Sequence, residues 1–229
     1  MSTLKLTPEF AALEQSIDYW FDDKELLIRA LTHRSFGALN NERLEFIGDG
    51  LVNAVVASML YAAHPSLDEG SLSRLRSKLV SKEGLAVLAH RFDLGPLIRL
   101  GTGERKSGGR NRESILSDAV EAIAGAILIE SGFERASEVV ARWFREGLKQ
   151  LDVSATRDAK TQLQEWLQGR GVALPVYSIM GVTGDDHDLC FDGSCITDAG
   201  SHTTYGKASS RKKAEQIAAH AMLEILTNE

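Results

Sequence analysis

The sequence lacks a run of about 18 consecutive apolar residues, which is the length at which a hydrophobic stretch becomes a candidate membrane span. Its first residues, Met1–Glu9, lack the apolar core of a signal peptide. Only two cysteines occur, Cys190 and Cys195, too few for a disulfide framework or a zinc site. We therefore expect no membrane partner, reduced thiols and a cytoplasmic location.

An excess of positive charge is also missing, because the formal net charge is −6. Nucleic-acid-binding domains are usually basic, so this counts weakly against such a partner. Net charge is a poor guide to the local field, however, and carboxylates gathered around metal ions are neutralised when the ions bind. The 229 residues, with 43% hydrophobic and 25% charged residues, fit a soluble globular protein of one or two domains.

Residues 1–150 have apolar residues at helical spacing and no strand-like alternation, which predicts an all-α domain. The glycine-rich segment 101–112 is the exception, with Arg105, Lys106, Arg110 and Arg112. It is expected to be a solvated loop, a mobile basic arm that contacts phosphate, or both. The expected helices are Glu9–Trp20, Asp23–Leu31, Asn41–Ala63, Gly70–Phe92, Asp118–Ser131 and Phe133–Leu148.

The pattern changes after residue 150. Residues 151–158 are polar, without an apolar face, and are expected to be a linker. Residues 159–229 read as a small α+β domain of the order α-β-β-β-α. Its expected elements are a helix at Lys160–Gln168, strands at Val176–Thr183, Asp188–Ile196 and His202–Lys207, and a helix at Ser210–Leu226.

Two predicted helices each carry carboxylates on one face. Glu42, Glu45 and Asp49 stand at i, i+3 and i+7, and Asp118 and Glu121 at i and i+3, so each set points roughly the same way. Apolar stripes beside the two sets would bury one side of each helix. The stripes are Leu44, Ile47, Leu51 and Val55 in the first helix, and Leu116, Ala119, Ile123 and Ile127 in the second.

Helix rise decides which carboxylates share an ion. Glu45 and Asp49 are about 6 Å apart along the axis, and Asp118 and Glu121 about 4.5 Å, whereas Glu42 and Asp49 are about 10.5 Å apart. We therefore expect Glu45, Asp49, Asp118 and Glu121 to be metal ligands, with Glu42 at the rim. All-oxygen ligands select Mg²⁺, with Mn²⁺ as a substitute. The alternative is a solvated acidic surface with Arg43 and Lys78 as ion-pair partners.

The run Asn41–Asp49 closely resembles the signature of the ribonuclease III family, and Glu113–Glu121, about 70 residues later, resembles the second acidic motif of that family. Leu31–Ser35 and Lys106–Gly109 match in the same order. The resemblance implies an endonuclease that cleaves double-stranded RNA by metal-dependent hydrolysis. It also implies staggered cuts with 5′-phosphate and 3′-hydroxyl ends, a homodimer, and processing of ribosomal RNA precursors and messages. The implied catalytic residues are Asp49, Glu121 and Glu42; the last would assist RNA engagement or the dimer cleft.

The C-terminal segment resembles a double-stranded-RNA-binding domain. A-form RNA offers 2′-hydroxyls in a shallow minor groove and phosphates along a narrow major groove, so polar and cationic side chains are needed. The first helix would present polar groups to the minor groove, with Leu163 and Trp166 toward the core, and the last helix would begin with cations at its positive end. The expected RNA-binding residues are Thr161, Gln164, Glu165, His187, Arg211, Lys212 and Lys213.

The chain departs from the family pattern at three positions. Gly50 and Ile47 stand where Ser and Leu are usual, and Ala208 where the last loop usually has a second glycine. Residues 158–229 contain six Lys/Arg and ten Asp/Glu, so affinity is expected to be modest and sensitive to salt. His33 is interpreted as structural, and Lys82 as either a phosphate-positioning or a surface lysine.

Two rival functions remain at this point: a catalytically silent regulator that binds double-stranded RNA, and a structural metal-binding helical protein. Retention of all four proposed ligands argues against the first. The cations at Arg211–Lys213 after an α-β-β-β run argue against the second.

Overall fold

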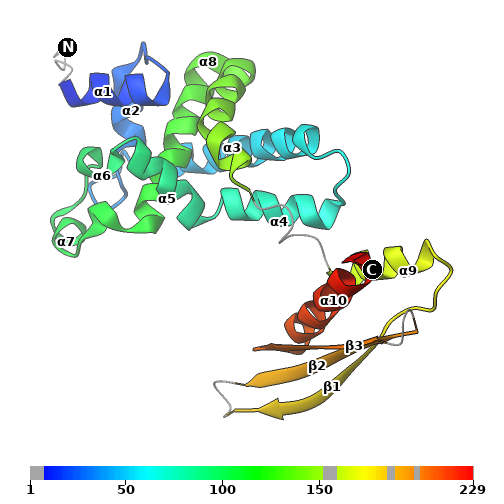
Figure 1. Ribbon diagram of the computed structural model, residues 1–229. Helices are drawn as coiled ribbons and strands as arrows, with labels where there is room; N and C mark the ends of the chain where they lie inside the picture. Colours follow the sequence, from blue (N-terminus) through cyan, green and yellow to red (C-terminus); the bar gives the residue numbers. More distant parts are fainter. Residues whose placement is uncertain (1–7, 152–158, 185–188, 199–201, 229) are drawn as a thin grey trace. The chain divides into compact units, whose positions relative to one another are not determined.

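The computed structural model describes residues 8–151, 159–184, 189–198 and 202–228. The chain divides into two compact units, 1–152 and 153–229, which are described separately (Figure 1). The expected linker and His187 lie outside the described residues, apart from Leu151.

The first unit is helical, as the sequence predicted, and its only strand-like pairing among the described residues is an isolated bridge between Thr32 and Arg99. Its helices are α1 (Pro8–Ile17), α2 (Lys24–Ala30), α3 (Glu42–Ala63), α4 (Glu69–Leu79), α5 (Lys82–Arg91), α6 (Leu94–Leu97), α7 (Thr102–Lys106), the 3₁₀ helix η1 (Gly109–Asn111) and α8 (Glu113–Lys149).

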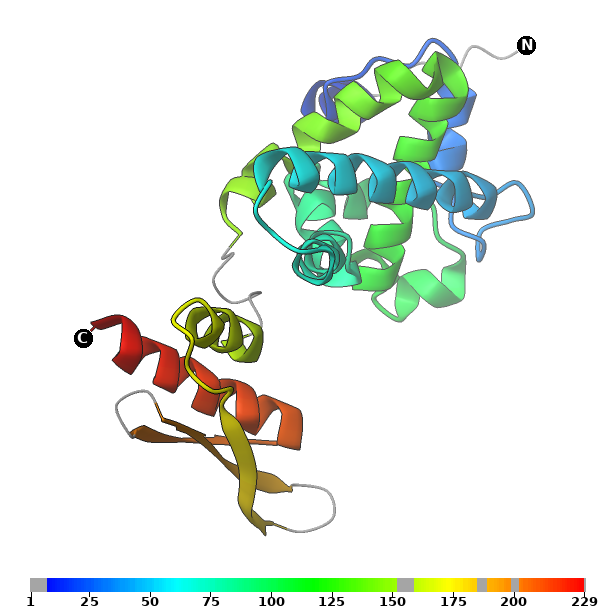
Figure 2. The same ribbon diagram turned by 90° about the vertical axis from the view of Figure 1, so that its right-hand side faces the viewer.

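Helices α3 and α8 form the centre of this unit. They pack more extensively against each other than either does against any other helix, and Figure 2 shows α3 running across α8. Gly132, with φ 79° and ψ 173°, interrupts α8, in agreement with the two helices predicted on either side of it. The first of them begins earlier than expected, at Glu113 instead of Asp118.

Two other predictions for this unit were wrong. The helix expected over Gly70–Phe92 is two helices, because the hydroxyl of Ser81 accepts a hydrogen bond from the backbone N–H of Gly84 (3.1 Å) and begins α5. The expected loop 101–112 contains α7 and η1, and an ion pair between Arg112 and Glu104 joins them.

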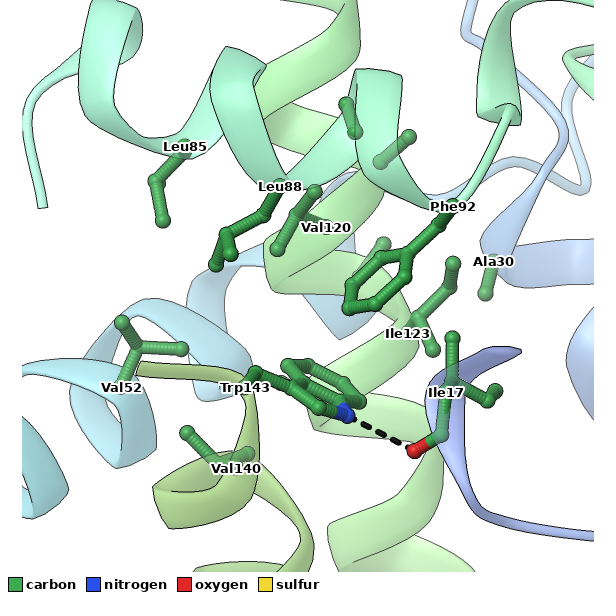
Figure 3. Close-up of a cluster of buried hydrophobic side chains, with 14 of the residues drawn as sticks. Ile17, Ala30, Val52, Leu85, Leu88, Phe92, Val120, Ile123, Val140 and Trp143 are labelled. Carbon is green, nitrogen blue, oxygen red and sulfur yellow. Dashed lines mark hydrogen bonds between the residues drawn. The ribbon is translucent and has the colours of Figure 1, made fainter. Parts of the chain in front are cut away.

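The second half of α8 packs back onto the core of the unit. The indole of Trp143 donates a hydrogen bond to the carbonyl oxygen of Ile17 (2.8 Å) and meets the ring of Phe92 edge-on, at 5.4 Å between centroids (Figure 3). Val120 and Ile123, from the first half of α8, line the same core. Both halves of α8 are therefore fixed by one apolar cluster.

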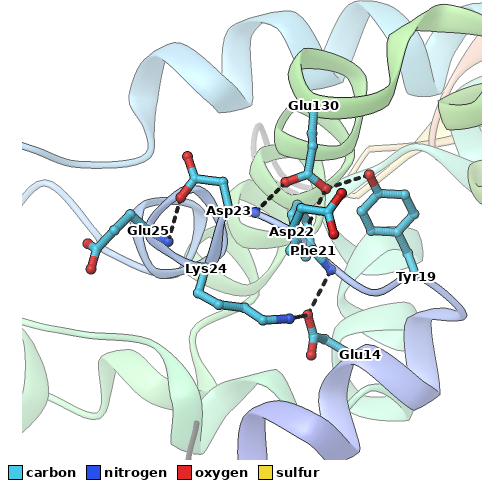
Figure 4. A network of polar contacts seen from close by, with 8 residues as sticks. All are labelled: Glu14, Tyr19, Phe21, Asp22, Asp23, Lys24, Glu25 and Glu130. Atoms are coloured by element: carbon cyan, nitrogen blue, oxygen red, sulfur yellow. Dashed lines mark hydrogen bonds and ion pairs between the residues drawn. The ribbon is translucent and has the colours of Figure 1, made fainter. Parts of the chain in front are cut away.

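Two carboxylates hold the N-terminal helices in place through hydrogen bonds and an ion pair (Figure 4). Glu130 of α8 accepts hydrogen bonds from the Tyr19 hydroxyl (2.6 Å) and the Asp23 backbone N–H (2.9 Å). Burial and the bond to Glu130 raise the pKa of Tyr19 to about 12. Glu14 pairs with Lys24 at 2.6 Å. These contacts fix α2, whose Arg29 donates a hydrogen bond to the carbonyl oxygen of Asn40, just before α3, at 3.1 Å.

The second unit has the predicted order α-β-β-β-α: α9 (Ala159–Gln168), β1 (Val176–Thr183), β2 (Cys190–Thr197), β3 (His202–Ala208) and α10 (Arg211–Asn228). The strands form an antiparallel sheet in sequence order, with a bulge between Ile179 and Gly181. Both helices lie on the same side of the sheet (Figure 1). Leu163, Leu167 and Met222 form the centre of its core.

By length and composition alone, α3 is long and apolar enough to cross a membrane, the only such helix in the described ranges. Core helices pass the same test. Leu44, Leu51, Val52 and Val55 of α3 are buried in the first unit, so we interpret it as a core helix.

Candidate active site

The site begins with an unusually close crossing of α3 and α8. A Cβ placed on Gly48 would lie 1.8 Å from the carbonyl oxygen of Glu121, and one on Gly125 would lie 2.0 Å from the carbonyl oxygen of Leu44. The two backbones therefore touch through glycines on both helices. This contact brings the acidic face of α3 against that of α8.

Three of the four expected ligands come together at the crossing. One oxygen from each of Glu45, Asp118 and Glu121 lies within 4.8 Å of the others, and all three side chains are half-buried. Oxygens around an octahedral ion lie about 3–4 Å apart, since each is about 2.1 Å from the metal. Small side-chain rotations would therefore let all three bind one cation.

Asp49 lies outside this group. It is exposed, and its carboxylate accepts a hydrogen bond from the amide of Asn53 one turn later, at 2.7 Å. Its charge nevertheless makes the largest electrostatic contribution, after burial, to the raised pKa of Glu121, which indicates that the two carboxylates lie close together. Its expected role as a ligand thus requires a change of rotamer.

The pKa values of the cluster are raised. Burial is the main cause for all three carboxylates, and it acts together with the neighbouring charges on Glu45 and Glu121. The pKa of Glu121 reaches about 8, through burial first and then the charges of Asp49, Asp118 and Glu45. A cation bound there would supply the positive charge that these three carboxylates lack.

The proposed acidic-surface alternative fits the structure poorly. Among the described residues, no Lys or Arg forms an ion pair with Glu45, Asp118 or Glu121, and Arg43 and Lys78 pair with no carboxylate. Glu42 is exposed and lies outside the group of three, with its carboxylate 3.6 Å from the guanidinium of Arg34.

Several cations surround the cluster without contacting it. The charges of Lys82, His33 and Arg34 oppose the rise in the pKa of Asp118. His33 also has a structural role: its Nδ1 lies 2.8 Å from the hydroxyl of Ser35, which accepts a hydrogen bond from the backbone N–H of Gly101 at 3.0 Å. These bonds attach the Leu31–Ser35 motif to the segment that leads into α7.

In the second unit, the expected RNA-binding side chains that the structure describes, all except His187, are exposed. Thr161, Gln164 and Glu165 lie on the outer side of α9, while Leu163 is buried and Trp166 half-buried. Lys212 and Lys213 are exposed in the first turn of α10, and the Ser210 hydroxyl accepts a hydrogen bond from the Lys213 backbone N–H at 3.3 Å. Arg211 pairs with Glu215.

Two departures from the family pattern, at Gly50 and Ala208, do not disturb the packing of the backbone. Nothing lies within 4 Å of a Cβ placed on Gly50, so that position has no packing need for glycine. A Cβ on Gly206 would lie 2.3 Å from the carbonyl oxygen of Ala214, so the glycine that the chain retains before α10 is the one that packing requires. Ala208 ends β3 and is only half-buried.

Sequence reasoning missed a surface at the start of α3. Phe46, inside the signature run, is 83% exposed. It borders a surface pocket of about 500 Å³ whose lining includes Leu26, Ile47 and Ile129. Ile47 was expected in the buried stripe and is instead half-buried. The presence of Phe between Glu45 and Ile47, off the buried stripe, was the available signal.

Two family models match the chain. The model described as "Ribonuclease-III-like" matches residues 23–148, and that described as "Double-stranded RNA binding motif" matches residues 159–226. The chain is also similar to "Ribonuclease 3" of Pseudomonas fluorescens, with 47% identity over 219 residues that cover 95% of this chain and 96% of the relative. "Ribonuclease 3" of Thiobacillus denitrificans is 50% identical over 210 residues, covering 91% and 93%.

Solved structures are similar to the first unit. The nuclease domain of ribonuclease III from Campylobacter jejuni is 44% identical, with a TM-score of 0.60, and covers 64% of this chain and 100% of that one. A second structure of that domain, described for structural flexibility in a region involved in dimer formation, is 45% identical with a TM-score of 0.58, and covers 60% and 97%.

Proposed function

Because this chain belongs to the ribonuclease III family, we propose that its acidic cluster hydrolyses phosphodiester bonds in double-stranded RNA. The observation that carries the proposal is the grouping of Glu45, Asp118 and Glu121 within 4.8 Å in the family's nuclease unit. The double-stranded-RNA-binding unit of the same chain supplies a second contact with the substrate.

We propose that Glu45, Asp118, Glu121 and a rotated Asp49 hold Mg²⁺, with Mn²⁺ as a substitute. The first three ligands suit a hard cation, because their carboxylate oxygens are half-buried and have no ion-pair partner among the described residues. A bound divalent cation polarises the phosphate and lowers the pKa of an attacking water. Glu121, with its pKa of about 8, must release its proton as the cation binds.

The reaction would break the bond between phosphorus and the 3′-oxygen. The water oxygen would attack phosphorus, its proton would reach the departing 3′-oxygen through solvent, and the products would carry 5′-phosphate and 3′-hydroxyl ends. Glu42, exposed and opposite Arg34, lies where it can support RNA engagement at the rim. Staggered cuts, ribosomal RNA precursors and messages as substrates, and a cytoplasmic location stay predictions from the sequence.

We further propose a homodimer formed around Phe46. An aromatic ring that is 83% exposed next to a pocket of about 500 Å³, lined by both aliphatic and charged side chains, suits a symmetric contact, in which Phe46 of each copy enters the pocket of the other. The Campylobacter relative has a region involved in dimer formation. Phe46→Ser should shift the sedimentation coefficient toward that of a monomer, whereas Tyr61→Ser, another exposed aromatic on α3, should not. Equal behaviour of the two variants would place the interface elsewhere.

Cleavage of a long perfect duplex, followed by analysis of product ends, tests the catalytic proposal. The unmodified chain should cut with Mg²⁺ and stop with a chelator, and Asp118→Asn should bind the duplex but not cut it. Glu134→Gln removes an exposed carboxylate from the same helix and should leave cleavage unchanged. Metal-independent cleavage, or full cleavage by Asp118→Asn, would refute the proposed site.

A further inference from the structure

One carboxylate in the second unit binds cations from both helices. Glu215, in α10, is only 9% exposed. Its Oε2 accepts a hydrogen bond from the ammonium of Lys160 at 2.7 Å, and its Oε1 accepts one from Nε of Arg211 at 3.0 Å. The bond from Lys160 is the main reason that the pKa of Glu215 is lowered. Each oxygen of this buried carboxylate is thus assigned to a different cation.

Lys160 connects Glu215 to the start of α9. It is the second residue of that helix, its ammonium lies 4.1 Å from the centre of the Tyr177 ring of β1, and its backbone N–H donates a hydrogen bond to the side chain of Gln216 at 3.4 Å. The N-terminus of α9 is therefore held against α10 by side-chain bonds at two successive residues of α10, Glu215 and Gln216.

Arg211 connects Glu215 to the start of α10. Its side chain is 69% exposed, yet Nε is bound to Glu215. A guanidinium has five N–H donors in a fixed plane, so one bond at Nε orients the plane and leaves the four terminal N–H groups available. Those groups lie at the exposed beginning of the helix, beside Lys212 and Lys213.

We propose that Glu215 is a positioning residue for double-stranded RNA. It sets the spacing between the α9 surface with Gln164 and the cations that begin α10, and it orients Arg211 toward phosphate. The spacing matters because an A-form duplex holds its minor groove and the neighbouring phosphates at a fixed distance. The inference rests on the proposed RNA-binding surface, which the experiment tests separately.

Glu215→Gln should have opposite effects on RNA binding depending on whether Glu215 acts by positioning its partners or only through its charge. Removing a negative charge beside an RNA surface should strengthen binding if only the electrostatic field matters. If Glu215 positions its partners, binding should weaken although the protein has become more positive. We expect the Kd of the full chain for a long RNA duplex, measured without divalent cations, to rise about tenfold, the effect of losing roughly one charge-assisted hydrogen bond.

Steady-state cleavage separates positioning from loss of folded protein. With Mg²⁺, positioning predicts a KM for the duplex that rises in parallel with Kd while kcat stays unchanged, because the acidic cluster is in the other unit. A merely structural role would lower the active fraction, and hence the apparent kcat. Glu215→Asp retains the charge but shortens the side chain, so it should also weaken binding, and it decides the question if Glu215→Gln fails to fold.

Two further variants complete the test. Glu224→Gln makes the same charge change at an exposed residue of α10 that pairs only with His220 (3.5 Å) among the described residues; it should bind RNA as tightly as the unmodified chain, or more tightly. Lys213→Met should weaken binding if the proposed surface is correct. If folded Glu215→Asp or Glu215→Gln binds RNA as the unmodified chain does, the role of Glu215 is wrong but the proposed surface stands. If Lys213→Met binds RNA unchanged, the proposed surface itself is wrong.

Discussion

Two glycines on α3, two residues apart, should respond in opposite ways to the same substitution. A methyl group at Gly48 would lie 1.8 Å from the carbonyl oxygen of Glu121 and 2.8 Å from the backbone nitrogen of Gly125. Carbon–oxygen contacts lie at about 3.3 Å, so α3 and α8 would have to separate by roughly 1.5 Å. Gly50 has no atom within 4 Å of such a methyl group and lies in the same helix.

The energetic difference follows from what must move. At Gly48 the obstacle is backbone, so Gly48→Ala should cost about 3 kcal/mol, the upper part of the range for overpacking. At Gly50 alanine should stabilise by about 1 kcal/mol through helix propensity. For a unit of this size, these values correspond to a Tm lower by roughly 6–12 °C and higher by roughly 2–4 °C.

Thermal unfolding of the full chain, followed through the buried Trp143 of the first unit, measures the difference. Cleavage should also fall in Gly48→Ala, by about 10²-fold, because Glu45 and Glu121 would be moved apart by more than 1 Å. Gly50→Ala should cleave normally. If the two variants differ by less than about 1 kcal/mol in unfolding free energy, the helices do not need to touch at Gly48 and the account of the crossing is wrong.

Four other predictions concern the metal and the RNA. Glu121→Gln should lose cleavage by at least about 10²-fold and retain duplex binding, whereas a near-normal rate would remove Glu121 from the ligands. Since folding raises the pKa of Glu121 from 4.5 to about 8, the unfolding free energy without metal should fall as pH rises from 4.5 to 8, and it should fall less steeply in Glu121→Gln, where only the raised pKa values of Glu45 and Asp118 remain in the cluster. Mg²⁺ should raise the Tm at pH 8, and less so in Asp118→Asn; equal shifts would locate the ion elsewhere. A chain ending near Asp152 should still cut duplex RNA at low salt and fail sooner as salt rises, because it lacks about three phosphate contacts; a truncated chain that folds and dimerises but never cuts would give the second unit a catalytic role.

Periodicity predicted most of the helices and most of the acidic cluster because both depend on residues a few positions apart. The buried stripe Leu116–Ile127 and the i, i+3 pair Asp118 and Glu121 follow directly from helix geometry. The position of Asp49 does not, because it depends on a local hydrogen bond to Asn53. The spacing allows this bond but does not require it.

Contacts between distant segments explain what the sequence left out. From sequence alone, a glycine inside a helix indicates only that the helix is less stable. The neighbours of Gly48 and Gly125 in the sequence therefore did not show that two helices cross at these residues. The composition of segment 101–112 favoured a loop, yet the pair Arg112 and Glu104 joins two helical turns there. The exposure of Phe46 likewise depends on how α2, α3 and α8 are arranged around the pocket.

The acidic charge of the chain, which counted against a nucleic-acid partner, has two different structural meanings. Glu121 is half-buried beside other carboxylates, and the resulting rise in its pKa shows that the folded site disfavours negative charge until a cation is bound. Glu215 is more deeply buried, but two cations surround it and its pKa is lowered. The first carboxylate takes on its negative charge as a cation binds, and the second has its charge already balanced by two cations within the fold. Neither therefore repels RNA as an exposed carboxylate would, and the net charge of −6 overstates the negative field that a duplex meets at these two places.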